Sequence, residues 1–308
     1  MKRVKKSSAN NGYMKKTQRK EEMWCYIMLA LPIIGFVVFH VYPILWTFKW
    51  SFYSYDGIES NAVFIGLKNF KTVFKDSTYW ESWLTTLEFS VFKVPLEMLL
   101  AMGLAIILLK GLKGSGIFRI IFYMPNVISV AVIGVIFTNL FTYFGVFNTF
   151  LVDVGLIDKP IDWFASKGYA MLMLVIGSIW NTLGINVMYC MSALANVPEE
   201  LYECASLDGA NAWVKFTKIT LPMVMPVFSV VLLLSIIGTL STNDYILAFT
   251  GGAPNGATNT VMSYLTQGFV PGFTDTSTPP LGYGSAVSLV TTIIFAVVGV
   301  LHNKISNK

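Results

Sequence analysis

Residues 24–48 read WCYIMLALPIIGFVVFHVYPILWTF, a run of 25 residues without Asp, Glu, Lys or Arg. A transmembrane helix needs about 20 mostly apolar residues to cross a hydrocarbon core of about 30 Å. The run is longer than the roughly 7–15 residues of the apolar part of a signal peptide, and no small-residue cleavage site follows it. We therefore interpret it as a retained membrane span.

The chain contains five further stretches that meet or approach this length. We predict membrane spans at approximately residues 24–48, 84–109, 117–141, 169–194, 223–247 and 284–301. The composition agrees, because 55% of the 308 residues are hydrophobic and only 13% are charged, whereas a soluble domain usually has about 25% charged residues. The predicted fold class is an all-α polytopic membrane protein with six transmembrane helices.

The second predicted span is interrupted by Glu88, Lys93 and Glu97. Charged side chains at membrane depth face the interior of a helix bundle and pair with one another. Lys93 and Glu97 stand four residues apart and so share one face of a helix. We therefore expect them to form an ion pair inside the bundle.

The distribution of basic residues predicts the orientation. Cytoplasmic loops carry an excess of Lys and Arg, and 15 of the 22 Lys and Arg residues fall on the side of the N-terminus, whereas residues 248–283 contain none. Both termini are therefore predicted to be cytoplasmic. Residues 1–23 are polar and basic, and we expect a disordered cytoplasmic tail or one lying on anionic headgroups, in preference to a nucleic-acid-binding arm. Residues 24–308 form the predicted six-span domain.

Several kinds of catalytic site are missing from the sequence. There is no Gly-Lys dipeptide, so no Walker-type phosphate loop can form. His40 and His302 are isolated from any metal-binding pattern, and we expect the three cysteines to be free thiols. We find no GxSxG elbow. The chain is therefore expected not to be an enzyme, and to hold neither a metal nor a cofactor.

The loop between the fourth and fifth predicted spans, residues 196–222, reads NVPEELYECASLDGANAWVKFTKITLP. Pro198 suits the start of a helix, the glutamates that follow it favour the amide-rich N-terminus, and Gly209 suits its end. A second helix can start at Ala210 and lead to the fifth span, which predicts a cytoplasmic helix-turn-helix. One interpretation is an amphipathic connector on the membrane surface. The small residues around Gly209 favour another, in which a second protein approaches closely.

The stretch ECASLDGANAWVKFTKITLP, residues 203–222, resembles the EAA loop of ABC-importer permeases. The family pattern is E-A-A, three residues, G, nine residues and I-x-L-P, and Cys204 stands where the pattern has its first Ala. The resemblance implies that the loop docks as a coupling helix on a partner ATPase. The residues implied in coupling are Glu199, Glu200, Glu203, Cys204, Ala205, Asp208, Gly209, Ala210, Ile219 and Pro222.

Other segments resemble the carbohydrate-uptake branch of that family, in particular the larger permease of maltose-type and glycerol-phosphate-type importers. They are YPILWTFKWSFYSYDG (42–57), FIGLKNF (64–70), FRIIFYMPNVIS (118–129), IW (179–180) and FTGGAPNGAT (249–258). Asn243 departs from the family, which usually has Phe at this position before the Asp that stands six residues ahead of the TGG segment.

The resemblance implies a permease subunit of an ATP-driven sugar or oligosaccharide importer in a bacterial cell membrane. Its implied partners are a second homologous permease, two ATPase subunits that use ATP and Mg, and an extracellular solute-binding protein. A polyol or glycerol phosphate remains an alternative solute. A self-sufficient secondary carrier or channel is an alternative of another class, which would need a selectivity filter or an ion-coupling carboxylate and would not require the EAA spacing.

A transport pathway needs polar groups that face the bundle interior near mid-membrane. Polar side chains share a helical face in the fourth and fifth predicted spans, and Pro125 is expected to kink the third. Neutral hydroxyl and amide groups suit sugar hydroxyls, although each could equally hydrogen-bond a neighbouring helix. Trp180 could stack on a sugar or simply pack. With two positions added by the resemblance, Val130 and Ile185, the predicted pathway residues are Asn126, Ser129, Val130, Ser178, Trp180, Asn181, Thr182, Ile185, Ser235, Thr239, Thr242 and Asn243.

Overall fold

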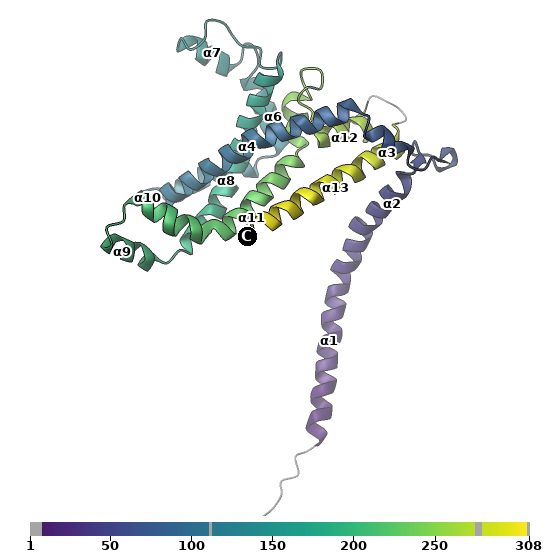
Figure 1. Cartoon of the computed structure of the whole chain (residues 1–308), viewed down its shortest axis with the longest axis horizontal. Helices are drawn as coiled ribbons and strands as arrows, with labels where there is room; N and C mark the ends of the chain where they lie inside the picture. The colour runs from purple at the N-terminus through teal and green to yellow at the C-terminus, as the bar shows by residue number, and fades with distance from the viewer. Residues whose placement is uncertain (1–7, 111–112, 275–278, 307–308) are drawn as a thin grey trace, which may run out of the picture.

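A computed structural model describes the backbone of residues 8–110, 113–274 and 279–306, and the side chains of residues 21–110, 113–274 and 279–304. Residues 1–7 of the predicted tail, and residues 307–308 at the end of the predicted domain, lie outside the described residues. The chain is mostly helical, and most of its long helices lie side by side in a bundle (Figure 1).

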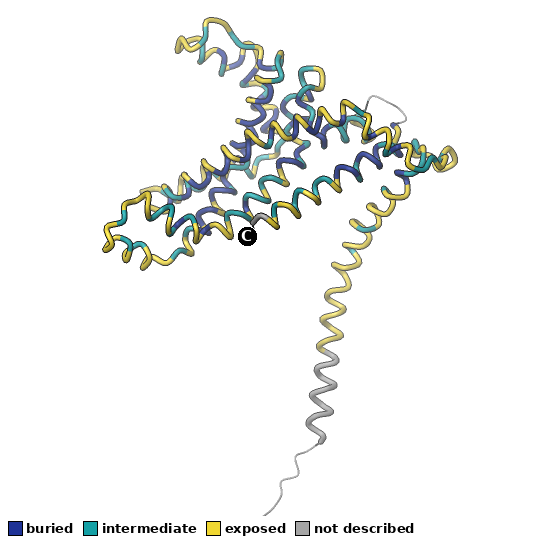
Figure 2. The backbone as a smooth tube through the Cα atoms, in the orientation of Figure 1, coloured by how far each residue is buried: buried dark blue, intermediate teal, exposed yellow. Residues whose placement is uncertain are grey.

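Four long helices form the bundle. They are α4 (Ser77–Leu109), α8 (Lys167–Ala195), α11 (Leu221–Leu240) and α13 (Leu281–Ser306). The central helix is α8, because 61% of its most apolar window is buried inside the protein, against 22–44% in the other three. Figure 2 shows the buried backbone along the inner sides of these helices. The largest buried cluster contains Phe89, Phe137, Leu174 and Phe249, so that it joins α4 and α8 to the segments beside them.

The first predicted span stands apart from the bundle (Figure 1). It runs without interruption through α1 (Ser8–Phe36), a π-helical turn η1 (Val37–Val41) and α2 (Tyr42–Trp50). None of its most apolar window is buried within the chain. The helix already begins at Ser8, within the stretch of residues 1–23 for which we expect a disordered tail or one lying on anionic headgroups. Extending an existing helix adds one hydrogen bond per residue without a new nucleus, and the Lys, Arg, Gln and Glu residues before the span are good helix formers.

The third predicted span, residues 117–141, is wrong as a single helix. It consists of α5 (Ser115–Val127) and α6 (Val130–Leu140), which are bent by 97° at the break between them. Ile128 is extended at this break, with ψ of 136°. Pro125 lies in the last turn of α5 and lacks the amide that would continue the helix. The described residues therefore contain five helices that are long and apolar enough to cross a membrane, or six if the bent pair is one span.

The fifth predicted span is also shorter than expected. α11 ends at Leu240 instead of residue 247, and a turn leads to the π-helical segment η4 (Ile246–Thr250). The residues after Leu240 are Ser, Thr and Asn, which favour caps and turns over helix interiors. By contrast, α4 is longer than expected and begins seven residues before the predicted start at residue 84. Asp76 caps it there by accepting a hydrogen bond from the Tyr79 amide at 3.2 Å.

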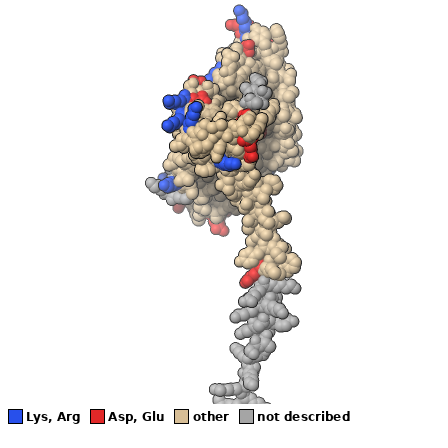
Figure 3. All heavy atoms as spheres, turned by 90° about the vertical axis from the view of Figure 1, so that its right-hand side faces the viewer, with Lys and Arg blue, Asp and Glu red and all other residues tan. Residues whose placement is uncertain are grey.

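Short elements occupy the two ends of the bundle. At one end lie the strands β1 (Tyr53–Ser54) and β2 (Val63–Phe64), paired antiparallel, which are a small exception to the all-α prediction. The helices α3 (Lys68–Val73) and α12 (Val261–Phe269) lie at this end, and α6 leads to α7 (Val146–Asp153). Seen from this side, most of the surface is uncharged; some basic residues gather in one patch and others lie apart from it (Figure 3). At the other end lie α9 (Glu199–Leu207) and α10 (Ala212–Lys215), together with the last turns of α13 (Figure 1).

Candidate functional site

A buried ion pair lies in the middle of the bundle. Lys93 Nζ is 2.9 Å from Glu97 Oε2, and 5% and 0% of their side chains are exposed. Both residues project from α4 toward α8 and α11, and the predicted pairing is confirmed. A lone buried charge is very unfavourable in an apolar interior, so each of these two residues stabilises the other.

Donors from two further helices complete this ion pair. Asn186 Nδ2 donates to Glu97 Oε1 at 2.8 Å, and Ser235 Oγ donates to Glu97 Oε2 at 3.0 Å. The Thr182 hydroxyl also donates to Oε1. Lys93 Nζ donates in addition to Thr239 Oγ1 at 3.2 Å. These residues, which we call the Glu97 cluster, connect α4, α8 and α11, and four donors meet on one carboxylate.

A cavity of about 240 Å³ lies beside the Glu97 cluster. Five of the twelve predicted pathway residues line it, namely Thr182, Ile185, Ser235, Thr239 and Thr242. The sequence reasoning did not include in the pathway the other polar residues that line it, which are Lys93, Glu97, Asn186, Tyr189 and Tyr245. The charges of Lys93 and Glu97, near the middle of a largely apolar span, were the signal that could have added these two residues.

Three other predicted pathway residues also lie on α8 but do not line this cavity. Asn181 is buried, donates to the Pro125 carbonyl at 2.6 Å and accepts from the Tyr245 hydroxyl. It thereby ties α8 to the end of α5. Ser178 is fully buried and donates to the Val175 carbonyl at 3.1 Å. Trp180 is 39% exposed, with its ring 5.7 Å from that of Phe137.

The remaining four predicted pathway residues lie away from the cavity lining. Asn126, Ser129 and Val130 are at the break between α5 and α6. Asn243 follows the end of α11, and its Oδ1 atom is buried without a hydrogen-bond partner among the described residues. The predicted pathway residues that line the cavity therefore lie on α8 and on or just after α11, and α4 contributes Lys93 and Glu97 to the same lining.

The predicted helix-turn-helix has well-defined geometry. α9 ends in a turn in which the Gly209 amide donates to the Ser206 carbonyl at 3.1 Å and the Ala210 amide to the Ala205 carbonyl at 2.9 Å. These two hydrogen bonds together form the Schellman motif, which requires a residue in the left-handed backbone conformation. Gly209 supplies it, with φ of +75°. The second helix, expected from Ala210, begins as α10 at Ala212.

The residues implied in coupling occupy this structure in order. On α9 lie Glu199, Glu200, Glu203, Cys204 and Ala205; in its terminal turn lie Asp208, Gly209 and Ala210; Ile219 lies in the π-helical segment η3 (Phe216–Thr220); and Pro222 lies in the first turn of α11. No residue of α9 is buried. Two contacts hold α9 to the second helix: Tyr202 and Thr220 share a hydrogen bond of 2.8 Å, and Lys215 Nζ donates to Ser206 Oγ at 2.6 Å.

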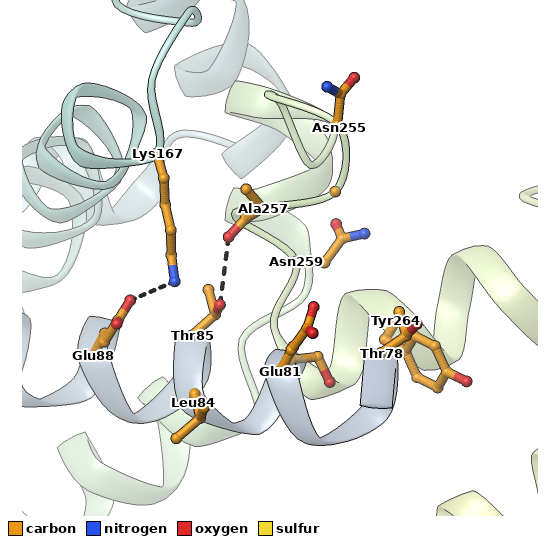
Figure 4. Close-up of a pocket in the computed structure, with 12 residues that line it drawn as sticks. Thr78, Glu81, Leu84, Thr85, Glu88, Lys167, Asn255, Ala257, Asn259 and Tyr264 are labelled. Atoms are coloured by element: carbon orange, nitrogen blue, oxygen red, sulfur yellow. Dashed lines mark hydrogen bonds and ion pairs between the residues drawn. The ribbon is translucent and has the colours of Figure 1, made fainter. Parts of the chain in front are cut away.

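A second pocket, of about 420 Å³, lies beside the first turns of α4 (Figure 4). Lys167 Nζ and Glu88 Oε2 form an ion pair of 2.7 Å at its edge, and Thr85 donates to the Ala257 carbonyl at 3.4 Å. This pocket is larger than the cavity beside the Glu97 cluster, but Glu81 and Glu88 on its wall are exposed to solvent. We take the inner cavity as the candidate site because buried polar groups from three helices converge on it.

Comparison with known proteins identifies the family of this chain. Residues 97–307 match the family model of the binding-protein-dependent transport system inner membrane component. The chain is 31% identical to the lactose transport system permease protein LacF of Rhizobium radiobacter, over 91% of this chain and 92% of that protein. It is 30% identical to the trehalose/maltose transport system permease protein MalF of Thermococcus litoralis, over 96% and 98% of the two chains.

The fold has close counterparts among solved structures. A chain of a bacterial ABC transporter that imports the acidic polysaccharide alginate superposes with a TM-score of 0.81, at 20% identity, over 96% of this chain and 98% of that chain. A second structure of a bacterial alginate transporter, in complex with a periplasmic protein bound to an alginate pentasaccharide, gives 0.78 at 22% identity. The two share the fold of this chain. From its matched residues and its relatives, the chain belongs to the family of binding-protein-dependent transport system inner membrane components.

Proposed function

We propose that this chain is the membrane-spanning permease subunit of an ATP-driven importer for a sugar or an oligosaccharide. The observation that carries the proposal is one continuous helix, Ala212–Leu240, which starts beside α9 and reaches the cavity. Ser235 and Thr239, near its far end, belong to the Glu97 cluster. The relatives named above carry lactose and trehalose or maltose, which supports the sugar class.

The same helix suggests how ATP hydrolysis drives transport. A partner ATPase that binds the exposed α9 and moves it would also move η3, through the Tyr202–Thr220 and Lys215–Ser206 hydrogen bonds. Movement of η3 tilts α11, because the two are parts of one helix. A tilt of α11 shifts Ser235 and Thr239 relative to α4 and α8, and so changes the side from which the cavity is open.

The proposal includes an assembly. A second homologous permease would complete the pathway, two ATPase subunits would bind ATP and Mg and hydrolyse the nucleotide, and an extracellular solute-binding protein would deliver the sugar. The excess of Lys and Arg on the N-terminal side supports an orientation with both termini and the α9–α10 loop in the cytoplasm. In that orientation the chain is a multi-pass protein of the cell membrane, and residues 24–308 are its permease domain.

A secondary carrier is the alternative with an observation in its favour. Glu97 is a buried carboxylate in the middle of a span, as proton-coupled carriers require. Its pairing with Lys93 and its three further donors favour a fixed structural charge over a proton carrier. A carrier would drive uptake in proteoliposomes from a pH gradient without ATP, and the proposed importer would not.

The experiment that tests coupling replaces Gly209 with Leu. A leucine at φ of +75° is strained, and its side chain would enlarge the small-residue surface that the ATPase is expected to grip. We expect the reconstituted complex to lose ATPase activity stimulated by the loaded binding protein, while the subunit still inserts into the membrane.

Gly114→Leu is the matched control, because Gly114 also has a positive φ, of +86°, and precedes α5 in a different loop. We expect this variant to keep stimulated ATPase activity, even though it carries similar backbone strain. Stimulated activity that is unchanged in Gly209→Leu would refute the coupling role of α9.

A further inference from the structure

The ion pair between Lys93 and Glu97 lies against the cavity wall but its carboxylate is already saturated. Glu97 is 0% exposed, and Lys93, Thr182, Asn186 and Ser235 all donate to it. A solute in the cavity therefore finds no free lone pair on Glu97 directed toward it. Any effect of Glu97 on the solute acts through the residues that it holds.

Glu97 determines which way its neighbours' hydroxyl groups point. An ionised carboxylate only accepts hydrogen bonds, and a hydroxyl has a single hydrogen to donate. Ser235 directs its hydrogen to Glu97 Oε2 at 3.0 Å. Thr182 is close to Glu97 Oε1 and to the Ser178 carbonyl, 2.9 Å away, and both of these are acceptors. The hydrogens of Thr182 and Ser235 are thus directed at the protein, and their lone pairs are left for the cavity.

Two more hydroxyls on the cavity wall have the same polarity. Thr242 donates to the Gly238 carbonyl at 3.0 Å, and Tyr245 donates to Asn181 Oδ1. Thr239 differs, because it accepts from Lys93 Nζ at 3.2 Å and keeps its own hydrogen for another partner. Four of the hydroxyls that line the cavity therefore present acceptors to a solute.

We propose that the Lys93–Glu97 pair directs the hydroxyl hydrogens of Thr182 and Ser235 into the protein, so that these two residues, together with Thr242 and Tyr245, accept hydrogen bonds from a neutral, hydroxyl-rich solute and reject a phosphate ester. The inference rests on the proposed function and narrows its substrate class. Sugar hydroxyls can donate to the lone pairs of Thr182, Ser235, Thr242 and Tyr245, whereas a phosphate has only acceptor oxygens to offer them. Because Lys93 balances Glu97 at 2.9 Å, the pair presents no net charge to attract an anion. Lys93 and Glu97 are positioning residues, since they act through the hydroxyls.

The test compares the wild-type complex with the double variant Lys93→Met/Glu97→Gln. The double variant removes both charges together, and so leaves no unpaired buried charge that would destabilise the protein. The new side-chain amide would offer a donor where the carboxylate only accepted, and would turn the hydrogen of Ser235 toward the cavity, whereas Thr182 can still donate to the Ser178 carbonyl. Glu88→Gln is the control, because Glu88 is on the same helix and is paired with Lys167, but is 50% exposed.

Binding is measured without ATP and without the binding protein, by saturation-transfer NMR on the complex in nanodiscs. The probes are trehalose and lactose, with trehalose 6-phosphate as the anionic match of trehalose. For the wild type and Glu88→Gln we expect transfer to at least one neutral disaccharide and none to trehalose 6-phosphate. For the double variant we expect unchanged thermal stability, and neutral-sugar binding about five- to tenfold weaker, the effect of one misdirected hydrogen bond.

Three results would overturn the inference: wild-type binding of trehalose 6-phosphate, no binding of either neutral sugar, or wild-type affinity in a stable double variant. If the double variant proves unstable, Lys93→Arg/Glu97→Asp keeps the charges and the acceptor-only carboxylate, and must then retain neutral-sugar binding. Failure of the proposed function gives a different result, because a complex that is not an ATP-driven importer shows no stimulated ATPase activity whatever its sugar affinity.

Discussion

Asp76 joins three segments at the end of the bundle opposite α9. Its Oδ2 atom accepts from the hydroxyls of Tyr264 and Tyr283, each at 2.6 Å, and its Oδ1 atom accepts from the Tyr79 amide at 3.2 Å. Burial raises the pKa of Asp76, but the hydrogen bonds together lower it by more than burial raises it. The carboxyl therefore has a pKa below its usual value. Asp76 therefore caps α4 and also fastens α12 and α13 to it.

We expect Asp76→Asn to destabilise the protein by about 1 kcal/mol, since an amide can keep the cap but not both tyrosine hydroxyls, and water competes at this partly buried site. A lowered pKa in the folded protein stabilises it above the unfolded value of about 3.9, and this stabilisation is lost as the pH falls toward the folded value. The melting temperature in detergent should therefore fall more steeply between about pH 5 and pH 3 in the wild type than in Asp76→Asn.

Asp56→Asn is the control for this pH dependence. The pKa of Asp56 is also lowered, by its hydrogen bonds with Ile58 and Asn61, but Asp56 is partly exposed and these bonds stay within one loop. Its replacement should leave the melting curve of the wild type almost unchanged. Equal pH dependence in the wild type and in Asp76→Asn would show that Asp76 does not stabilise this end of the bundle.

Sequence reasoning reached the residue scale only where an interaction is local. Lys93 and Glu97 are four apart on one helix, and their pairing follows from helical geometry alone. Asn186 and Ser235 join them from 89 and 138 residues away, through the way α8 and α11 pack on α4. That packing depends on small residues and on bends whose consequences are three-dimensional, so these partners could not be predicted from spacing.

At the scale of elements, α8 packs against α5 through a glycine. A Cβ atom added to Gly184 would overlap the Phe122 carbonyl and lie 2.7 Å from Tyr123 Cα, both of which belong to the backbone of α5. Backbone cannot move aside as the tip of a side chain can. The close approach holds α5 near Asn181, whose amide donates to Pro125 at the end of α5.

Gly184→Ala is therefore expected to destabilise the protein by about 1–3 kcal/mol, the usual effect of overpacking a core. Gly103→Ala is its counterpart in α4, where an added Cβ meets nothing within 4 Å. A glycine in a helix interior is less stable than alanine by about 0.5–1 kcal/mol, so this control should be neutral or stabilising. Thermal unfolding of both purified variants measures the difference, and equal stability would contradict the close contact between α5 and α8.

The limits of prediction were clear at this scale too. Long apolar runs predicted α4, α8, α11 and α13, and most ends of these helices lie within a few residues of the predicted ones. A run of that composition has few other ways to fold in a membrane. The 97° bend between α5 and α6 was beyond the sequence. Pro125 predicted a kink, but the size of the bend depends on Ile128 leaving the helix and on Asn181 holding the Pro125 carbonyl.

At the scale of the whole molecule, the three cysteines report on its orientation. Cys204 is exposed on α9, Cys190 is buried in α8, and Cys25 lies in the first span. In a Cys25→Ser background, a membrane-impermeant maleimide should label Cys204 in inside-out vesicles and not in intact cells, while Cys190 reacts only after denaturation.

The opposite side is probed by Phe144→Cys in the same background, with Cys204 also replaced by Ser. Phe144 is 88% exposed in the connection between α6 and α7. This thiol should react in intact cells. Labelling of Cys204 and of the cysteine at 144 from the same side would contradict the proposed orientation. The arrangement of charge predicted the orientation from sequence, whereas the position of α1 apart from the bundle had no sequence signal, since its apolar run resembles those of the packed helices.

The Lys93–Glu97 pair also bears on how the protein is made. Lys93 is the middle residue of α4, and one lysine at the centre of an inserting helix costs about 3 kcal/mol. Because its counter-charge is one turn away on the same helix, the pair can form as soon as α4 is synthesised, long before α8 and α11 emerge from the ribosome. The helix can therefore pass from the translocon into lipid with its central charges already balanced, and does not have to wait for the rest of the chain.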